Sequence, residues 1–282
     1  MRRILTLSLI FATLLTSVFA NAATPDQGRL NVMSYNIRYS KGQDGTNSWV
    51  FRYPASAMMI LDQKPDIVGI QEALEDQFEY LGDYVEGYKI IGVGREDGKK
   101  KGEIMAILYN TQTLSLVKWG TFWLSETPKK PSKGWDAACF RTATWAVMKD
   151  KRNGQKFVMV NTHLDHKGVE ARRNGLALIL SKISEVNPKG LPIVITGDFN
   201  VYPDVPELSD FRKAVKDARE TAFQTDHEGT YNGWGKAEPG KIIDYIWYDG
   251  FGSCTQYETV KKEYMERAYI SDHFPIKATL VY

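Results

Sequence analysis

Short apolar runs of strand length recur along most of this chain, and they limit the folds that it can adopt. Such runs occupy residues 30–36, 66–70, 88–93, 103–109, 114–124, 142–149, 156–162, 192–197, 242–248 and 274–282. They are rich in the β-branched and aromatic residues that strands prefer. The pair Asn153-Gly154, which separates two of these runs, is typical of a tight hairpin turn. The chain therefore consists mainly of strands that follow one another closely.

Helical patterns are few by comparison. Residues 54–63 begin with Pro54 and are followed by Pro65, which predicts a helix with a proline in its first turn. Residues 168–186 place apolar side chains on one face at helical spacing. Many strands, hairpin connections and only a few crossovers favour stacked mixed sheets with helices outside. They do not favour a doubly wound parallel sheet.

The first 22 residues have the pattern of a removable export signal. Residues 1–3 are basic, residues 4–19 are apolar, and residues 20–22 fit the small-x-small cleavage pattern. The apolar run contains several serine and threonine residues and is shorter than the roughly 18 apolar residues that a membrane span needs. We therefore expect a signal peptide over residues 1–22, no membrane span, and an exported protein that is periplasmic or secreted.

Charge and cysteine content limit the partners of the mature chain. Without Arg2 and Arg3, the 36 basic residues fall to 34, which equals the number of acidic residues. Duplex nucleic acid is bound largely by Lys and Arg, so a neutral chain does not favour a nucleic-acid partner. Residues 23–282 are long enough for one large domain, and we expect it to be monomeric. Cys139 and Cys254 are compatible with one disulfide or with two free thiols.

Acids, amides and histidines occur where the predicted strands end. They are Asn36, Glu72, His163 with Asp165, Asp198 with Asn200, and Asp272 with His273. Another acid, Asp244, follows two isoleucines and would be costly to bury without a partner. Carboxylate and amide oxygens suit a hard cation such as Mg²⁺, and no spacing typical of a zinc site is present. These residues predict metal-assisted hydrolysis at the strand ends.

Six of these segments occur in a recognisable order along the chain. They are residues 33–37, 66–72, 161–165, 196–200, 243–246 and 271–273. In sequence and order they resemble the endonuclease/exonuclease/phosphatase superfamily, whose fold is shared by deoxyribonuclease I, abasic-site endonucleases, sphingomyelinases and inositol polyphosphate 5-phosphatases. The resemblance extends from about residue 29 to the C-terminus. It implies an α/β fold of the α+β type, a four-layer sandwich in which two stacked mixed β-sheets are flanked by helices.

The resemblance also implies roles for individual residues. Glu72 would be the principal metal ligand, with Asn36 beside it and Asp272 near the ion. His273 would be the imidazole next to the attacking water, and His163 would hydrogen-bond a non-bridging phosphate oxygen. We expect the two histidines to face one phosphate-sized space, whereas His166 and His227 should take no part.

Five further residues complete the site that the resemblance implies. Asp198 and Asn200 would position the nucleophile and a phosphate oxygen, and Asp244 would support one of the two imidazoles. Glu103 resembles the acid that in some members pairs with the first histidine, and Arg141 resembles a phosphate-facing arginine. A structural ion pair is the alternative for Glu103 and for Arg141.

These observations together favour an exported, Mg²⁺-dependent phosphoester hydrolase, with Mn²⁺ or Ca²⁺ as alternative ions. It would act on a small or soluble phosphomonoester or phosphodiester by in-line attack of an activated water. A secreted nuclease and a catalytically inactive binding module of the same fold are the alternatives. The sequence does not decide which ester is cleaved or whether one or two metals bind. Trp123 and Trp135, in a long loop region, are expected to form an aromatic wall beside the phosphate site.

Overall fold

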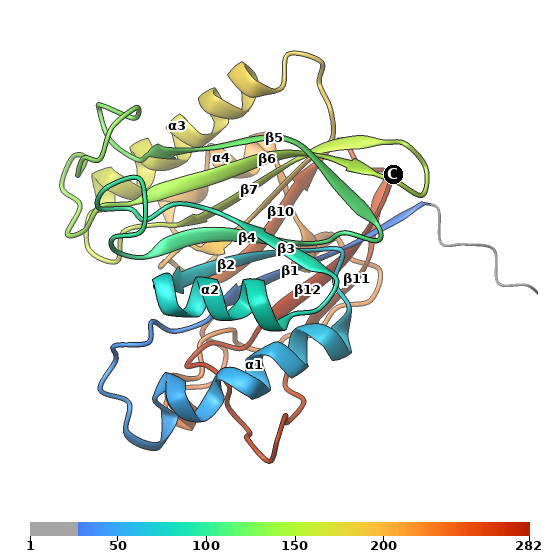
Figure 1. The fold of residues 1–282 in the computed structure, drawn as a ribbon. Coiled ribbons are helices and arrows are strands. Elements are labelled where there is room, and N and C mark those ends of the chain that lie inside the picture. The colour runs from blue at the N-terminus through green and yellow to red at the C-terminus, as the bar shows by residue number, and fades with distance from the viewer. Residues whose placement is uncertain (1–27) are drawn as a thin grey trace, which may run out of the picture.

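Two six-stranded mixed β-sheets lie face to face at the centre of the computed structural model, with helices on both outer sides (Figure 1). The structure describes residues 28–282, so the predicted signal peptide lies outside the described residues. The expected four-layer sandwich is confirmed. Among the described residues, no helix is both long and apolar enough to cross a membrane.

The first sheet contains the N-terminal and C-terminal strands of the described chain. Its order is β11 (Ser253–Thr259), β12 (Ile276–Val281), β1 (Arg29–Asn36), β2 (Ile67–Ala73), β4 (Ile104–Asn110) and β3 (Tyr88–Ile91). β1 and β2 are parallel, and the other neighbours are antiparallel. The helices α1 (Trp49–Gln63) and α2 (Glu75–Tyr84) cover its outer face (Figure 1).

The second sheet contains the middle of the chain. Its order is β5 (Leu114–Trp123), β6 (Thr142–Asp150), β7 (Lys156–His163), β8 (Ile193–Asp198), β10 (Asp244–Asp249) and β9 (Lys216–Asp217). β7 and β8 are parallel, because the helix α3 (Val169–Val186) connects them across the outer face. The shorter helices are α4 (Phe211–Ala214), α5 (Ala218–Thr221) and the 3₁₀ turns η1 (Gly45–Asn47), η2 (Pro206–Leu208) and η3 (Gly233–Gly235).

The core has three apolar layers. Between the sheets, Val32 and Ile107 of the first sheet pack with Met159 and Ile246 of the second. A second layer fills the space under α3, and a third fills the space under α1 and α2. Because both sheets are covered on both faces, their inner strands β2, β4, β7 and β8 are almost entirely buried.

A polar contact joins the two sheets near the ends of β2 and β7. The side chain of Asn161 in β7 donates to the backbone oxygens of Ile70 and Ala106 in the first sheet, at 2.8 Å each. Gln71 donates to Asn161 Oδ1 at 2.6 Å. Gly69 allows this close approach, because a Cβ at that position would lie 1.9 Å from Thr196 Oγ1. The sheets are therefore fixed to each other by directional bonds as well as by apolar packing.

One predicted helix boundary was wrong. The helix predicted over residues 54–63 begins at Trp49, so Pro54 lies in its interior rather than in its first turn. Proline removes one intrahelical hydrogen bond, but the carbonyl that loses it belongs to Val50, which is 63% exposed and can bond water. Trp49 packs against Tyr53 and Tyr80, and this packing holds the extra turn in place.

Other elements differ from the sequence prediction in extent or were not predicted. The strand predicted over residues 66–70 continues through Glu72 to Ala73, and α2 and β11 were not predicted at all. The Asn153-Gly154 turn does connect β6 to β7, with Gly154 at a φ of 77°. Cys139 and Cys254 are both free thiols.

Candidate active site

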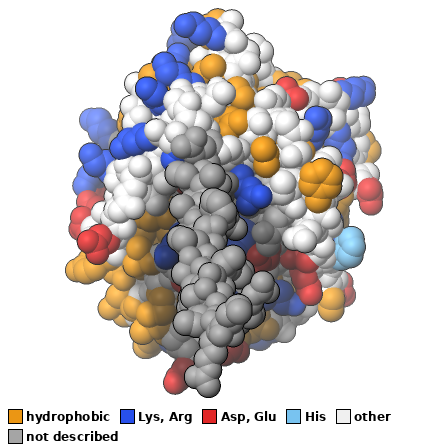
Figure 2. Space-filling model, turned by 90° about the vertical axis from the view of Figure 1, so that its right-hand side faces the viewer, with side chains coloured by type: hydrophobic (Ala, Val, Ile, Leu, Met, Phe, Trp, Pro, Cys, Tyr) orange, Lys and Arg blue, Asp and Glu red, His pale blue; other side chains and the backbone are white. Residues whose placement is uncertain are grey.

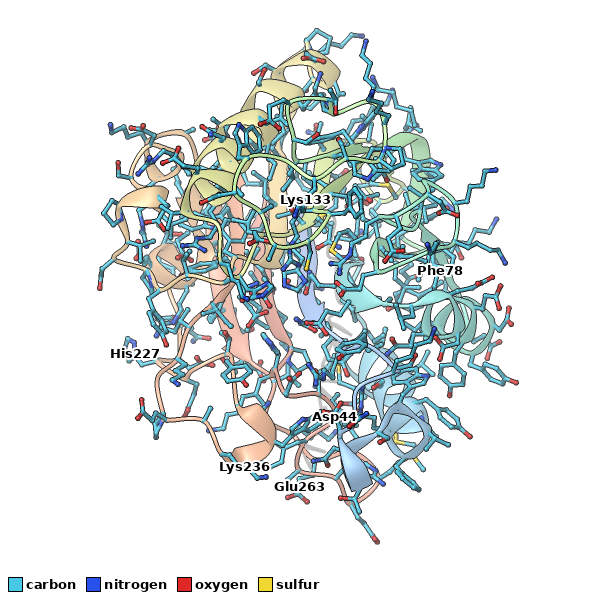
Figure 3. All side chains as sticks on the ribbon, turned by 90° about the vertical axis from the view of Figure 1, so that its left-hand side faces the viewer. Asp44, Phe78, Lys133, His227, Lys236 and Glu263 are labelled. Atoms are coloured by element: carbon cyan, nitrogen blue, oxygen red, sulfur yellow. The ribbon has the colours of Figure 1, made fainter. Side chains whose placement is uncertain are left out.

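A cavity of about 490 Å³ opens where β2, β7, β8 and β10 end or begin. Its walls include carboxylates from both sheets, two imidazoles from distant parts of the sequence, and several arginines and tyrosines. Figure 3 shows this end of the molecule, with the loops that carry Asp44, Lys133 and His227 arranged around it. The cavity therefore lies where the sequence placed its chemically active strand ends.

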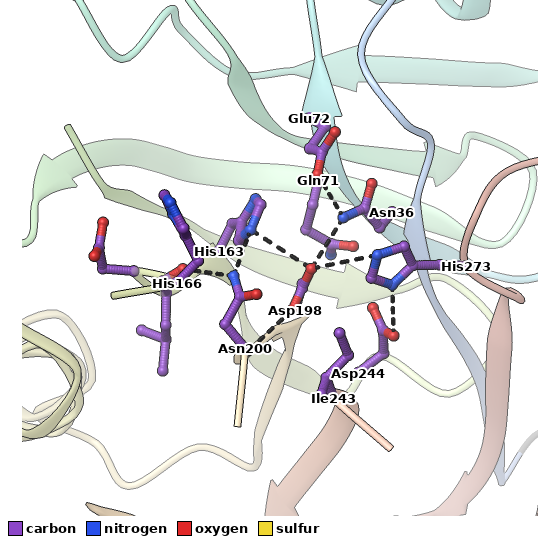
Figure 4. A network of polar contacts seen from close by, with 12 residues as sticks. Asn36, Gln71, Glu72, His163, His166, Asp198, Asn200, Ile243, Asp244 and His273 are labelled. Atoms are coloured by element: carbon purple, nitrogen blue, oxygen red, sulfur yellow. Dashed lines mark hydrogen bonds and ion pairs between the residues drawn. The ribbon is translucent and has the colours of Figure 1, made fainter. Parts of the chain in front are cut away.

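Asp198 lies at the centre of the site, at the end of β8. Its Oδ2 atom is 3.5 Å from Nε2 of His163 and 3.7 Å from Nε2 of His273 (Figure 4). All three side chains are at least nine-tenths buried and line the same cavity. The structure thus brings the two histidines to one space, as the sequence predicted.

His273 carries a positive charge in this arrangement. Its Nδ1 atom lies 2.8 Å from Oδ2 of Asp244, which is the buried acid that needed a partner. Burial disfavours the charged imidazole, but the charges of Asp244 and Asp198 outweigh it and raise the pKa of His273 to about 10. At neutral pH this residue can donate hydrogen bonds from both ring nitrogens. It is therefore suited to bind an anion and not to act as a general base.

His163 differs from His273 in charge. Burial, together with the charges of Arg141 and Arg95, lowers the pKa of His163 well below its ordinary value. The side-chain amide of Asn200 lies 2.9 Å from Nε2 of His163. Since the amide donates, His163 Nε2 accepts, and the ring proton sits on Nδ1, 3.8 Å from Glu103 Oε2. One imidazole of the site is thus neutral and the other is charged.

Asp198 is poised to accept a proton near neutral pH. Burial and the neighbouring charge of Asp244 raise the pKa of Asp198 to about 7. Its Oδ1 atom accepts the backbone N–H of Asn200 at 2.9 Å, and its Oδ2 atom accepts the side-chain N–H of Asn36 at 3.0 Å. These bonds fix the carboxylate while leaving it inside the cavity. A carboxylate with such a pKa is matched to general-base chemistry.

Glu72 enters the cavity because β2 is distorted at its end. The pairing of β2 with β4 shifts between Ile70 and Ala73, and Glu72 has a φ of 65°. Gln71 consequently points between the sheets, while Glu72 lines the cavity. Such a backbone conformation costs of the order of 1 kcal/mol for a residue other than glycine, and its presence at a polar site is consistent with a functional constraint.

The neighbours of Glu72 leave room for a cation. Its carboxylate accepts only the side-chain N–H of Asn36 at 3.0 Å and the backbone N–H of Tyr39 at 3.1 Å among the described residues. The amide oxygen of Asn36 accepts the N–H of Arg38. Asn36 therefore presents its NH₂ group to Glu72 and Asp198, which fits a supporting role better than the predicted role of a ligand.

A divalent ion fits the donor set of the cavity. Glu72, Asp198 and Asp272 all line it and supply only oxygen atoms, which hard cations prefer. One oxygen of Glu72, one of Asp198 and one ring nitrogen of His163 lie within 4.8 Å of one another. Burial and the charge of Glu72 raise the pKa of Asp272.

Basic and tyrosine side chains that the sequence did not single out also line the cavity. They are Arg38, Arg95, Tyr39, Tyr202, Tyr231 and Lys241. Arg95 pairs with Glu103 at 2.7 Å, so Glu103 contacts an arginine more closely than it contacts His163. Tyr231 packs edge-on against His273, with ring centroids 5.0 Å apart. Of these residues, only Arg38 could have been found from the sequence, because it follows the end of β1 two residues after Asn36.

One expectation about neighbouring residues was wrong. Trp123 and Trp135 do not line the cavity; Trp123 is buried, and its indole N–H donates to the backbone oxygen of Arg95. His166, which we expect to take no part in the reaction, lines the cavity and contacts Arg141. Figure 4 shows His166 on the far side of His163 from Asp198. His227 does not line the cavity.

Comparisons with known proteins agree with the fold. The model of the endonuclease/exonuclease/phosphatase family matches residues 33–273. A mannosyl-6-phosphatase of Bacteroides thetaiotaomicron is 37% identical, with a TM-score of 0.85 over 90% of this chain and 100% of its own. A Bacteroides vulgatus protein described as an endonuclease/exonuclease/phosphatase is 38% identical, with a TM-score of 0.85 over 89% of this chain and 98% of its own.

More distant structures share the architecture alone. The catalytic domain of human nocturnin is 19% identical and has a TM-score of 0.70, over 90% of this chain and 93% of that domain. The family match covers nearly the whole described chain and contains every residue of the central site. The protein is therefore a member of the endonuclease/exonuclease/phosphatase family.

Proposed function

We propose that this protein is a divalent-metal-dependent phosphoester hydrolase whose substrate is a small, soluble phosphomonoester. Members of its family are hydrolases that act on phosphoester bonds. The observation that carries the proposal is the convergence of a charged and a neutral imidazole on Asp198, beside Glu72 in one cavity. This arrangement offers a base, hydrogen-bond donors and a cation site around a space suited to one phosphate.

Glu72 would hold the ion, with Asp272 close to it, and we propose Mg²⁺ as that ion. When bound, it would supply positive charge to a phosphate oxygen. Asp198 accepts a proton from the attacking water, since its pKa lies near neutrality. Asn200 holds His163 in place through its side-chain amide. His273, kept charged by Asp244, donates to a phosphate oxygen as negative charge develops.

A sugar phosphate is the substrate class that we favour. The similar protein from Bacteroides thetaiotaomicron is named as a mannosyl-6-phosphatase. The cavity volume lies within the range of about 300–1,000 Å³ that is common for small-molecule sites. Tyr202, which is 51% exposed, and Tyr231 provide aromatic surfaces at the cavity for a sugar ring.

A duplex nucleic acid is not favoured. The mature chain carries equal numbers of basic and acidic residues. On the described part of the face opposite the cavity, Lys and Arg side chains lie among acidic and apolar ones (Figure 2). Counterion release would contribute little to duplex binding by a mature chain without net positive charge. We also propose export, with removal of residues 1–22, on the basis of the N-terminal sequence pattern.

The test is a screen of the mature chain with and without added Mg²⁺. The panel contains hexose 6-phosphates, glycerol 3-phosphate, an inositol phosphate, a nucleotide and supercoiled plasmid DNA. We expect metal-dependent phosphate release from a sugar phosphate at a higher kcat/KM than from the other esters. Plasmid nicking at physiological salt with a higher kcat/KM than any small ester would replace the proposal with a nuclease.

A further inference from the structure

Arg141 lies at the cavity with part of its guanidinium group unpaired. It immediately precedes β6, is 5% exposed and lines the cavity. Its Nε atom donates to Asp165 Oδ2 at 3.3 Å, and its Nη2 atom lies 3.1 Å from Nδ1 of His166. Its Nη1 atom is buried and has no hydrogen-bond partner among residues 28–282. A buried charged donor without a partner is destabilising, which points to a ligand that is absent from the free protein.

Asp165 accepts hydrogen bonds from two backbone segments next to Arg141. Its Oδ1 atom accepts the N–H groups of Ala138, Lys167 and Gly168, at 2.8–3.1 Å. Its Oδ2 atom accepts the N–H of Cys139 as well as Arg141 Nε. Asp165 thereby ties the segment before β6 to the turn after β7.

The bonds to Asp165 also exclude a metal site at this place. Cys139, Asp165 and His166 present ligand atoms within 4.8 Å of one another. Both Asp165 oxygens, however, are already occupied by hydrogen bonds from the protein. Burial opposes ionisation of Asp165, but these backbone N–H groups and the charge of Arg141 outweigh it and hold its pKa below its usual range. Asp165 therefore serves to position Arg141 and not to bind a metal ion.

His166 holds the other end of the guanidinium. An arginine can only donate hydrogen bonds, so Nδ1 of His166 must accept, and the ring proton is on Nε2. Burial and the charge of Arg141 lower the pKa of His166, which keeps Nδ1 free to accept. With Asp165 at Nε and His166 at Nη2, the guanidinium has a fixed direction, while Nη1 has no partner among the described residues.

We propose that Asp165 and His166 position Arg141 to bind the terminal oxygen that distinguishes a phosphomonoester from a phosphodiester. The inference rests on the proposed function and names the ester class that the site prefers. A monoester has one more non-bridging oxygen than a diester, and arginine recognises such oxygens through charge-assisted hydrogen bonds. In a diester that oxygen carries a second carbon group. A diester would therefore leave the buried guanidinium of Arg141 without a charged acceptor.

The experiment compares 4-nitrophenyl phosphate with bis(4-nitrophenyl) phosphate, which release the same leaving group. Arg141→Gln should lower kcat/KM for the monoester by about a hundred- to a thousand-fold, as expected for loss of one preorganised donor. The loss for the diester should be at least tenfold smaller, so that the monoester-to-diester ratio falls. An equal loss for both esters would overturn the proposal and leave Arg141 with a structural role.

A matched pair of variants separates positioning by His166 from simple packing. In His166→Asn the side-chain oxygen takes the place of Nδ1, whereas in His166→Gln it takes the place of Nε2. The Asn variant should keep the monoester-to-diester ratio within about threefold of the wild type, whereas the Gln variant should lower it by about tenfold. Equal ratios in the two variants would overturn the role of His166. His227→Gln, at a histidine outside the cavity, serves as the control.

A binding measurement keeps the inference testable if the wild type hydrolyses neither ester. Inorganic phosphate and dimethyl phosphate are titrated into the wild type and Arg141→Gln by calorimetry. We expect the wild type to bind phosphate at least tenfold more tightly than dimethyl phosphate, and the variant to lose this preference. Lack of hydrolysis with this result would count against the proposed function alone, while equal binding of the two anions would overturn the inference.

Discussion

Asp244 and His273 form a buried ion pair 2.8 Å long that joins the first residue of β10 to the segment before β12. The pair ties β10 of the second sheet to the segment that leads into β12 of the first sheet. It also decides the charge of the imidazole that faces Asp198. The next residue of the chain, Phe274, donates its backbone N–H to the oxygen of Thr230, which fixes the imidazole further.

Asp244→Asn should remove the charge of the His273 imidazole while keeping its shape. We expect kcat to fall by about a hundred- to a thousand-fold, because a charged donor becomes a neutral one. His273→Gln should cost about as much, and the double variant should cost little more than either single variant. Steady-state kinetics of the four proteins measure this coupling, and independent, multiplicative losses would contradict it.

Glu72→Gln should weaken Mg²⁺ binding and activity together. The amide oxygen can still accept the N–H groups of Asn36 and Tyr39, so the fold should be retained. Loss of the carboxylate charge should lower Mg²⁺ affinity at least tenfold, as titration calorimetry would report. Glu75→Gln, at an exposed acid paired with Lys100, is the matched control. Unchanged metal affinity in Glu72→Gln would remove Glu72 from the metal site.

Asp217→Asn should stabilise the protein at neutral pH. Burial raises the pKa of Asp217 to about 6, above its ordinary value of 3.8, so the folded state prefers the protonated acid. Stability from this group is present below about pH 4 and is lost as pH rises through 6. The variant should therefore gain roughly 1–3 kcal/mol at pH 7 and nothing at pH 3.5.

The measurement is urea unfolding of both proteins at pH 7 and pH 3.5. Asparagine should preserve the cap of α5, because Asp217 Oδ1 accepts the N–H of Arg219 and an amide oxygen does the same. A variant less stable than the wild type at pH 7 would show that the ionised form is needed in the folded state.

Arg52→Lys should destabilise the loop that leads into the cavity. Arg52 is fully buried and donates to the backbone oxygens of Ile37, Arg38, Asn47 and Ile270. A lysine cannot reach these acceptors in the same fork geometry, so we expect a loss of about 3 kcal/mol or more in the free energy of unfolding. Chemical denaturation measures it, with Arg173→Lys on the exposed face of α3 as control.

Tyr202→Ala should raise KM for a hexose phosphate more than for glycerol 3-phosphate, which has no ring to stack. The expected difference is about five- to tenfold, in line with one aromatic contact. Trp135→Ala should leave both KM values within about twofold, since Trp135 does not line the cavity. A larger effect of Trp135 than of Tyr202 would restore the aromatic wall that the sequence suggested.

The central residues of the site were predictable because they follow buried strands. Asp198 ends an apolar run, and Asp244 interrupts one, so each acid had to be functional or paired. Apart from Arg141, the arginines and tyrosines of the cavity wall were not predictable, because loops place them. Arg95, for example, reaches the site through its contact with Glu103, the residue that precedes β4. The same limit applies to α2, whose outward face is largely polar and whose position depends on packing against α1.

The close approach of Gly69 to Thr196 sets the spacing of the two sheets, and this spacing affects the chemistry of the site. Glu72 belongs to the first sheet and Asp198 to the second, so the gap between the sheets is also the gap between the proposed cation and the proposed base. A methyl group added behind the cavity would lengthen that gap without touching either carboxylate. Residues buried between the sheets therefore determine the distance between these two carboxylates as well as the stability of the fold. A substitution there can inactivate the protein while every polar residue of the site is retained.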